Sequence, residues 1–242
     1  MSLNPDTQAP ESPPTYTESG LTNDIWEPTI LVLNKTTIHR ESTTSPALYR
    51  LSRAVSAITA ATKIVEFERI EHTVKTKLAS NDLEPVVKPR SRHIYNLRYW
   101  RRPTGLSALI VGWTVPDIRI QSVSRSGTLG HLGLKRPRFQ QKTELKVYPM
   151  DISGDIVSWL PSSSKNTKPV FQIQQKDGKS TWKDGDNRVI ATEDLDGEDQ
   201  HKLIITVSLH QEIVDALVAL WCALIWQHSN QNIDEGLDGG KL

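Results

Sequence analysis

The chain has 242 residues, of which 37% are hydrophobic, and its 29 basic and 28 acidic residues nearly balance. This length fits one large β-rich domain or two small ones, and the low hydrophobic content indicates that part of the chain is not packed. The single cysteine, Cys222, excludes a disulfide scaffold. Because the polar N-terminus lacks the apolar region of a signal peptide, we expect a cytoplasmic or nuclear protein.

Charge is distributed unevenly along the chain. Residues 1–150 contain 21 basic and 13 acidic residues, whereas residues 151–242 contain 8 and 15. The asymmetry is greatest in residues 88–146, which hold 13 basic and only 2 acidic residues. Such a pattern predicts either an anionic partner or pairing within the molecule.

The two ends of the chain have the composition of disordered segments. Residues 1–24 contain four prolines and many Ser, Thr and acidic residues, and residues 230–242 are rich in glycine and acidic residues. Neither segment can bury enough apolar surface to offset the entropy of ordering. We therefore expect one folded domain over residues 25–229.

Short apolar or alternating runs predict about twelve strands between these ends. They cover residues 29–33, 36–40, 47–52, 62–74, 93–100, 106–115, 144–150, 155–160, 169–175, 180–183, 188–193 and 201–208. Turns are expected at Asn34-Lys35, Asp177-Gly178 and Asp184-Gly185. Residues 78–88 have the composition of a loop, residues 54–61 could instead begin a short helix, and about 101–142 is interpreted as a basic insertion.

The segment from Ile213 to Trp226 is apolar at almost every position, with Asp215 as its only charged residue. A helix that is apolar on all sides must be buried on all sides. The run is 14 residues long, shorter than the roughly 20 residues of a membrane span, so a helix buried in protein is favoured over a tail anchor. Ser208 and Gln211 have the spacing of a capping box, which predicts a helix from about Leu209 to His228.

Many short strands followed by one buried helix favour a barrel, because a sandwich has no room for an encircled helix. We therefore predict a mainly β fold, a closed antiparallel barrel of roughly twelve strands around a buried hydrophobic C-terminal helix. Trp182, Trp221 and Trp226 are expected in its core.

Four segments resemble the tubby C-terminal-like superfamily, which includes tubby, phospholipid scramblase and the LURP-one-related proteins, and in particular its fungal members. They are ALYRLSR (47–53), RHIYNLRY (92–99), TWKDGDNRVIATED (181–194) and KLIITVSLHQEIVDALVALWCALIW (202–226). The resemblance implies a twelve-stranded barrel around a C-terminal helix, and a module that binds phosphoinositides at membranes. Scramblases also have a cysteine-rich palmitoylation motif and a calcium-binding segment; this chain has neither, so lipid scrambling is not expected. No catalytic residues carry over.

Basic residues around one predicted strand and the following loop form the candidate site for anionic phospholipid or phosphoinositide headgroups. They are Arg90, Arg92, Arg98, Arg101, Arg102, Lys135, Arg136 and Arg138. The simpler interpretation is a solvated surface, paired with the acidic residues 193–199. A protein-interaction or scaffold domain without lipid binding is the alternative function, and a nucleic-acid partner is disfavoured because no binding motif is recognisable.

Enzymatic activity, a cofactor and a metal are not expected. The seven histidines lack the spacing of metal ligands, and Cys222 within an apolar helix is a poor nucleophile. Gly127, Gly130 and Gly133 lack the spacing of a dinucleotide or phosphate-binding loop and are interpreted as part of a flexible loop. The sequence thus favours a non-enzymatic binding module.

Overall fold

The computed structural model describes residues 25–55, 62–76, 85–99, 118–124, 126–135, 144–150, 168–176, 179–196 and 200–238. Within these ranges, residues 73–76, 85–87, 195–196 and 230–238 are described by their backbone alone. The predictions for residues 1–24, 106–115 and 155–160, and for most of residues 54–61, lie outside the described residues.

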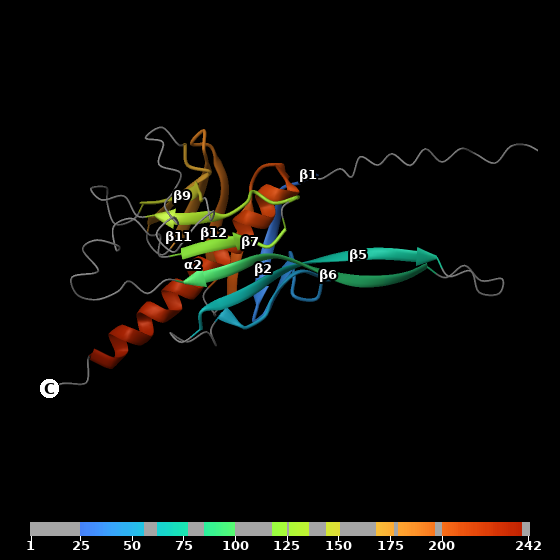
Figure 1. Ribbon diagram of the computed structural model, residues 1–242, viewed down its shortest axis with the longest axis horizontal. Helices are drawn as coiled ribbons and strands as arrows, with labels where there is room; N and C mark the ends of the chain where they lie inside the picture. The colour runs from blue at the N-terminus through green and yellow to red at the C-terminus, as the bar shows by residue number, and fades with distance from the viewer. Residues whose placement is uncertain are drawn as a thin grey trace, which may run out of the picture.

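Twelve antiparallel strands close into a barrel, as predicted (Figure 1). They are β2 (Thr29–Asn34), β3 (Thr37–Arg40), β4 (Ala47–Leu51), β5 (Ile64–Thr76), β6 (Pro85–Tyr99), β7 (Ile118–Ser122), β8 (Leu132–Lys135), β9 (Glu144–Pro149), β10 (Phe171–Lys176), β11 (Lys179–Asp184), β12 (Val189–Asp196) and β13 (Gln200–Ile205). Consecutive strands are neighbours, β13 pairs with β2, and β9 pairs with β10 to complete the ring. Outside the ring, β1 (Ile25–Trp26) pairs with β14 (Leu209–His210).

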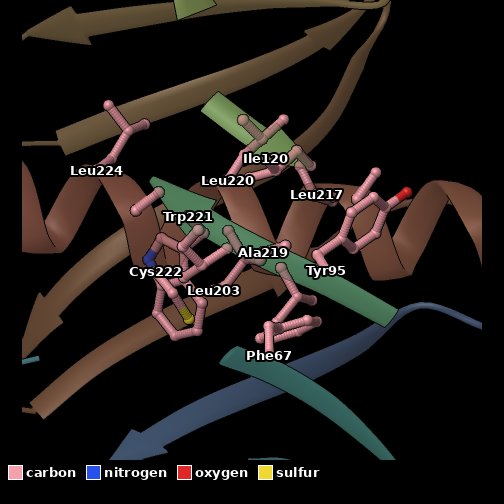
Figure 2. Close-up of a cluster of buried hydrophobic side chains, with 14 of the residues drawn as sticks. Phe67, Tyr95, Ile120, Leu203, Leu217, Ala219, Leu220, Trp221, Cys222 and Leu224 are labelled. Carbon is pink, nitrogen blue, oxygen red and sulfur yellow. The ribbon is translucent and has the colours of Figure 1, made fainter. Parts of the chain in front are cut away.

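The interior is filled by α2 (Gln211–Asp238), which passes through the barrel. From Val214 to Trp226 no residue is more than 4% exposed, so this part of the helix has no face in water. Figure 2 shows Leu217, Leu220 and Trp221 of α2 among side chains that come from separate strands, such as Phe67 and Leu203. Each large apolar side chain buried in this way contributes roughly 1.5–3 kcal/mol relative to full exposure.

Alternation along each strand decides which side chains meet the helix. On β6, Tyr95 and Leu97 face inward and are buried, while Asn96 and Arg98 face outward. The predicted turns at Asn34-Lys35 and Asp184-Gly185 connect β2 to β3 and β11 to β12. Trp182, Trp221 and Trp226 lie in the core as expected.

The start and the end of the helix differ from the prediction. Ser208 does not cap the helix, because its hydroxyl donates to Glu27. The Gln211 side chain donates to Asp215 inside the barrel instead of completing a capping box. The helix also continues past His228 to Asp238, because adding a residue to a formed helix is far easier than starting one. The expected disordered tail from residue 230 is therefore helical up to Asp238.

Two segments predicted to be irregular are strands. β7 and β8 lie within the supposed insertion at 101–142, so residues 118–135 belong to the barrel wall. Ile118, Ile120 and Leu132 are buried, but the two strands have only five and four residues and lie among basic residues. The sequence therefore shows no clear alternation there. Similarly, β6 begins at Pro85, inside the predicted loop 78–88.

Candidate anion-binding surface

A buried polar network closes the end of the barrel at which α2 begins, here named the entry rim. Asp215 is fully buried and accepts three hydrogen bonds, from Tyr49 Oη at 2.9 Å, Arg69 Nη1 at 2.9 Å and Gln211 Nε2 at 2.7 Å. Gln211 in turn accepts a hydrogen bond from Trp26 Nε1 at 2.6 Å. Burial raises the pKa of Asp215 to about 6, although Arg69 and the other donors favour its ionised form. This network joins β1, β4, β5 and α2. Its donors are directed at acceptors within the network, so we assign it a structural role.

A second polar cluster lies deeper in the barrel, around Glu193 of β12. Its Oε1 accepts a hydrogen bond from Trp221 Nε1 at 3.0 Å and lies 3.6 Å from His201 Nδ1. Burial opposes ionisation of Glu193, but His201, Ser180 and Trp221 outweigh it and lower the pKa of this carboxyl. Serine, histidine and glutamate are thus close together, yet the carboxylate is the shared partner, whereas nucleophilic catalysis needs the serine beside the imidazole. The cluster anchors Trp221 to the barrel wall.

The predicted basic site is divided between the two ends of the barrel. Arg92 lies opposite Arg69 near the entry rim, and Arg90 is opposite Glu71 beyond it. Arg98 lies six residues further along β6, about 20 Å away at the rise of a β-strand, and on the outward face. Its end of the barrel is the exit rim, where Tyr99 contacts Trp226 of α2 with ring centroids 6.0 Å apart.

The described part of the predicted site therefore does not form one cluster. Arg92 is engaged within the molecule, donating to Ser124 Oγ at 3.2 Å and to the carbonyl of Ser126 at 3.1 Å. Lys135 lies at the end of β8, which runs in the same direction as β6, so both strands end at the exit rim. Arg101, Arg102, Arg136 and Arg138 lie outside the described residues; in the sequence they follow the ends of these two strands.

The register brings a different set of basic side chains together on the outside of the barrel. Three pairs lie directly opposite each other on neighbouring strands: Arg98 with Arg119, Lys135 with Lys146, and Lys176 with Lys179. Lys183, opposite Gln172, continues the row that contains Lys146. Six of these residues are not buried, and we name them the basic face: Arg98, Lys135, Lys146, Lys176, Lys179 and Lys183. Arg119 lies on the same side of the wall but is only 5% exposed, so it is not part of this face.

Like charges directly opposite each other destabilise a sheet. Arg119 illustrates the cost, because burial and the charge of Arg98 lower its pKa to about 10. Acidic side chains offset part of the charge: Glu144 pairs with Lys146 at 3.2 Å, and Asp194 of β12 pairs with Lys179 at 2.9 Å. Two lysines of the basic face are thus paired within the molecule, and among the described residues the face still holds more basic than acidic side chains.

Of this surface, the sequence predicts only Arg98 and Lys135. Lys146, Lys176, Lys179 and Lys183 are isolated basic residues in the sequence. Alternation predicts that Lys146 faces outward, between the buried Leu145 and Val147. Its position opposite Lys135 follows only from the register of β8 against β9.

The sequence matches no family model, no curated protein and no solved structure. What defines the protein is therefore its own architecture, a closed twelve-stranded antiparallel barrel filled by a C-terminal helix. In the described part of the chain, no three His, Cys, Asp or Glu side chains are grouped so that they could hold a metal ion. None of the described helices combines the length and the apolar character that crossing a membrane requires.

Proposed function

We propose that the protein is a non-enzymatic binding module whose basic face binds the phosphorylated headgroups of an anionic membrane surface. The carrying observation is the two opposed lysine pairs on one side of the barrel, Lys135 with Lys146 and Lys176 with Lys179. Arrangements that break a local rule of stability are found mainly at functional sites, where a ligand supplies the missing charge. The chemistry is that of lysine and arginine with phosphate, and the resemblance to tubby-like proteins agrees with it.

A membrane surface fits this face better than a small pocket does, because the basic residues extend over six neighbouring strands. Each positive charge near an acidic leaflet contributes about 1 kcal/mol, and the contribution falls within a Debye length of about 8–10 Å. Several residues of the basic face would therefore act together as a peripheral membrane contact that depends strongly on salt.

Sedimentation with vesicles that contain phosphoinositide tests the proposal. Removing two charges by Lys135→Ala/Lys146→Ala should weaken binding by roughly 2 kcal/mol, or roughly 30-fold, at about 0.1 M salt. The matched control is Lys35→Ala/Arg53→Ala, which removes the same charge from exposed positions outside the basic face and should bind almost as the unmodified protein does. A soluble inositol phosphate added as competitor separates headgroup recognition from attraction to the surface alone.

Two results would reject the proposal: absence of vesicle binding at low salt, or equal losses in the two double variants. The alternative function, a protein-interaction domain that binds no lipid, would then be preferred. One observation favours that alternative independently, namely the two-stranded ribbon of β5 and β6, which extends beyond the barrel (Figure 1).

A further inference from the structure

The ribbon of β5 and β6 leaves the barrel at the entry rim. On one side, β4 pairs with β5 only up to Arg69, and on the other, β7 pairs with β6 only from Tyr95 onward. β5 and β6 nevertheless continue to pair with each other as far as Thr76 and Pro85. The seven residues from Ile70 to Thr76 span about 23 Å, and no other described strand pairs with them. The ribbon therefore has two open edges, each with backbone groups that point outward.

The two edges differ in their ability to accept another strand. The carbonyl of Glu66 accepts from the amide of Ser52 on the β4 side, so even-numbered residues of β5 direct their amides and carbonyls to that side. Further along, these are the backbone groups of His72 and Val74, with no proline among residues 70–76. On β6, by contrast, Pro89 lies opposite His72 and Pro85 opposite Thr76, so their missing N–H groups fall on the open edge of β6. The edge of β6 is blocked, and the edge of β5 is available.

The sequence along the available edge is complementary to itself. Residues 71–75 are Glu-His-Thr-Val-Lys. If two copies pair antiparallel about Thr73, Glu71 of each copy lies opposite Lys75 of the other, and His72 lies opposite Val74. Moving the centre by two residues in either direction would oppose two glutamates or two lysines, which is unfavourable. Charge therefore disfavours both of these shifted registers.

We propose that two copies of the chain associate through the β5 edge, with a two-fold axis at Thr73, to form a continuous four-stranded antiparallel sheet. Charged residues on an edge strand commonly prevent such pairing, and that is the competing explanation of Glu71 and Lys75. The arrangement of these two charges favours pairing over its prevention. Glu71 and Lys75 have opposite charges and lie symmetrically about Thr73, so they attract each other in a two-fold pair. The inference is independent of the proposed lipid binding, since the dimer is measured without vesicles.

Disulfide cross-linking of the full chain tests the register. In the proposed pair, the two Thr73 residues form a non-hydrogen-bonded pair with Cα atoms about 4.5 Å apart, which a disulfide can bridge. Thr73→Cys should therefore give a cross-linked dimer under mild oxidation. Ser91→Cys is the control, because it keeps Glu71 and Lys75 and lies opposite Ile70 on β6, away from the β5 edge. Its two copies would be more than about 14 Å apart, and it should cross-link on the order of tenfold more slowly. The native Cys222 is fully buried and does not compete.

Charge reversal supplies a second, independent measurement. Lys75→Glu should abolish the dimer in sedimentation velocity, and Glu71→Lys/Lys75→Glu should restore it by exchanging the two charges. Because Glu71 also pairs with Arg69 at 2.8 Å, circular dichroism should confirm that the double variant is folded. Equal cross-linking of the Ser91→Cys and Thr73→Cys variants would overturn the proposal. So would a folded protein that stays monomeric, with Thr73→Cys uncross-linked at high concentration.

Discussion

Tyr49 and Asp215 are 166 residues apart in the sequence, and the Tyr49 phenol donates a hydrogen bond of 2.9 Å to the Asp215 carboxylate. Both side chains are fully buried, so neither has water as an alternative partner. The bond connects a strand of the barrel wall to the first turns of the helix inside it. An isolated carboxylate would not be tolerated there, and its donors make a charged residue compatible with the apolar helix.

Tyr49→Phe should lower the free energy of unfolding by about 2 kcal/mol, because it leaves a buried carboxylate with one donor fewer. The phenylalanine ring keeps the stacking on Phe67, for which the ring centroids are 5.2 Å apart, so the effect isolates the hydroxyl. Urea unfolding at neutral pH measures the change. Tyr148→Phe, on the outward face, is the control and should change stability by no more than about 0.5 kcal/mol. Equal midpoints for Tyr49→Phe and the unmodified protein would contradict the role given to this bond.

The raised pKa of Asp215 predicts a specific dependence of stability on pH. Its folded value of about 6 exceeds the ordinary 3.8, so the folded state holds this proton more tightly than the unfolded state does. The corresponding stabilisation is complete below about pH 4 and is lost as the pH rises through about 6. Two pKa units correspond to roughly 3 kcal/mol. Asp215→Asn removes this titration, so the stability of the unmodified protein relative to the variant should fall by about that amount between pH 4 and 7. Parallel stability curves over this range would show that the prediction is wrong.

The contribution of Glu193 should make stability depend on pH in the opposite direction. Its pKa lies below the ordinary 4.5, so its ionised form stabilises the folded state above that pH, and the contribution is lost as the pH falls further. Glu193→Gln keeps an oxygen acceptor for Trp221 Nε1 but removes the charge beside His201. The variant should be about 1–2 kcal/mol less stable at pH 6, and the difference should shrink below about pH 4. Chemical unfolding across this range measures it, and a difference that grows on acidification would disagree with the assignment.

The architecture could be predicted from the sequence because the pattern of hydrophobic residues within each short segment indicates its strand or helix and its buried face. Alternation in residues 93–100 predicts a strand with Tyr95 and Leu97 on one face, and an apolar run on every face of a helix requires a surrounding wall. The strands that were missed, β7 and β8, have only five and four residues, too few for alternation to stand out among basic neighbours.

The candidate site was less predictable because it depends on register. Arg92 and Arg98 lie on one strand, yet they approach opposite ends of the barrel on opposite faces. The register skips Ile94 of β6, because Phe67 lies opposite Tyr95 and Glu68 lies opposite His93. This extra residue, at a bulge, changes the parity of β6, so alternation counted from Tyr99 does not continue to Arg92. No local feature of the sequence indicates this bulge. Likewise, no local feature indicates that Lys146 lies beside Lys135.

Removing the helix should remove the fold, because its side chains are the interior of the barrel. Leu220→Ala leaves a cavity at a fully buried position and should cost about 2–5 kcal/mol, whereas Leu220→Asp places an unpaired charge there and should abolish folding. Truncation before Gln211 should give insoluble protein, since the inward faces of twelve strands would be exposed together. Glu212→Ala, at an exposed position on the first turn, is the matched control and should remain soluble with nearly unchanged stability. Soluble fractions, circular dichroism and urea unfolding distinguish these outcomes, and a truncated chain that stays soluble with native-like circular dichroism would show that the strands do not need the helix.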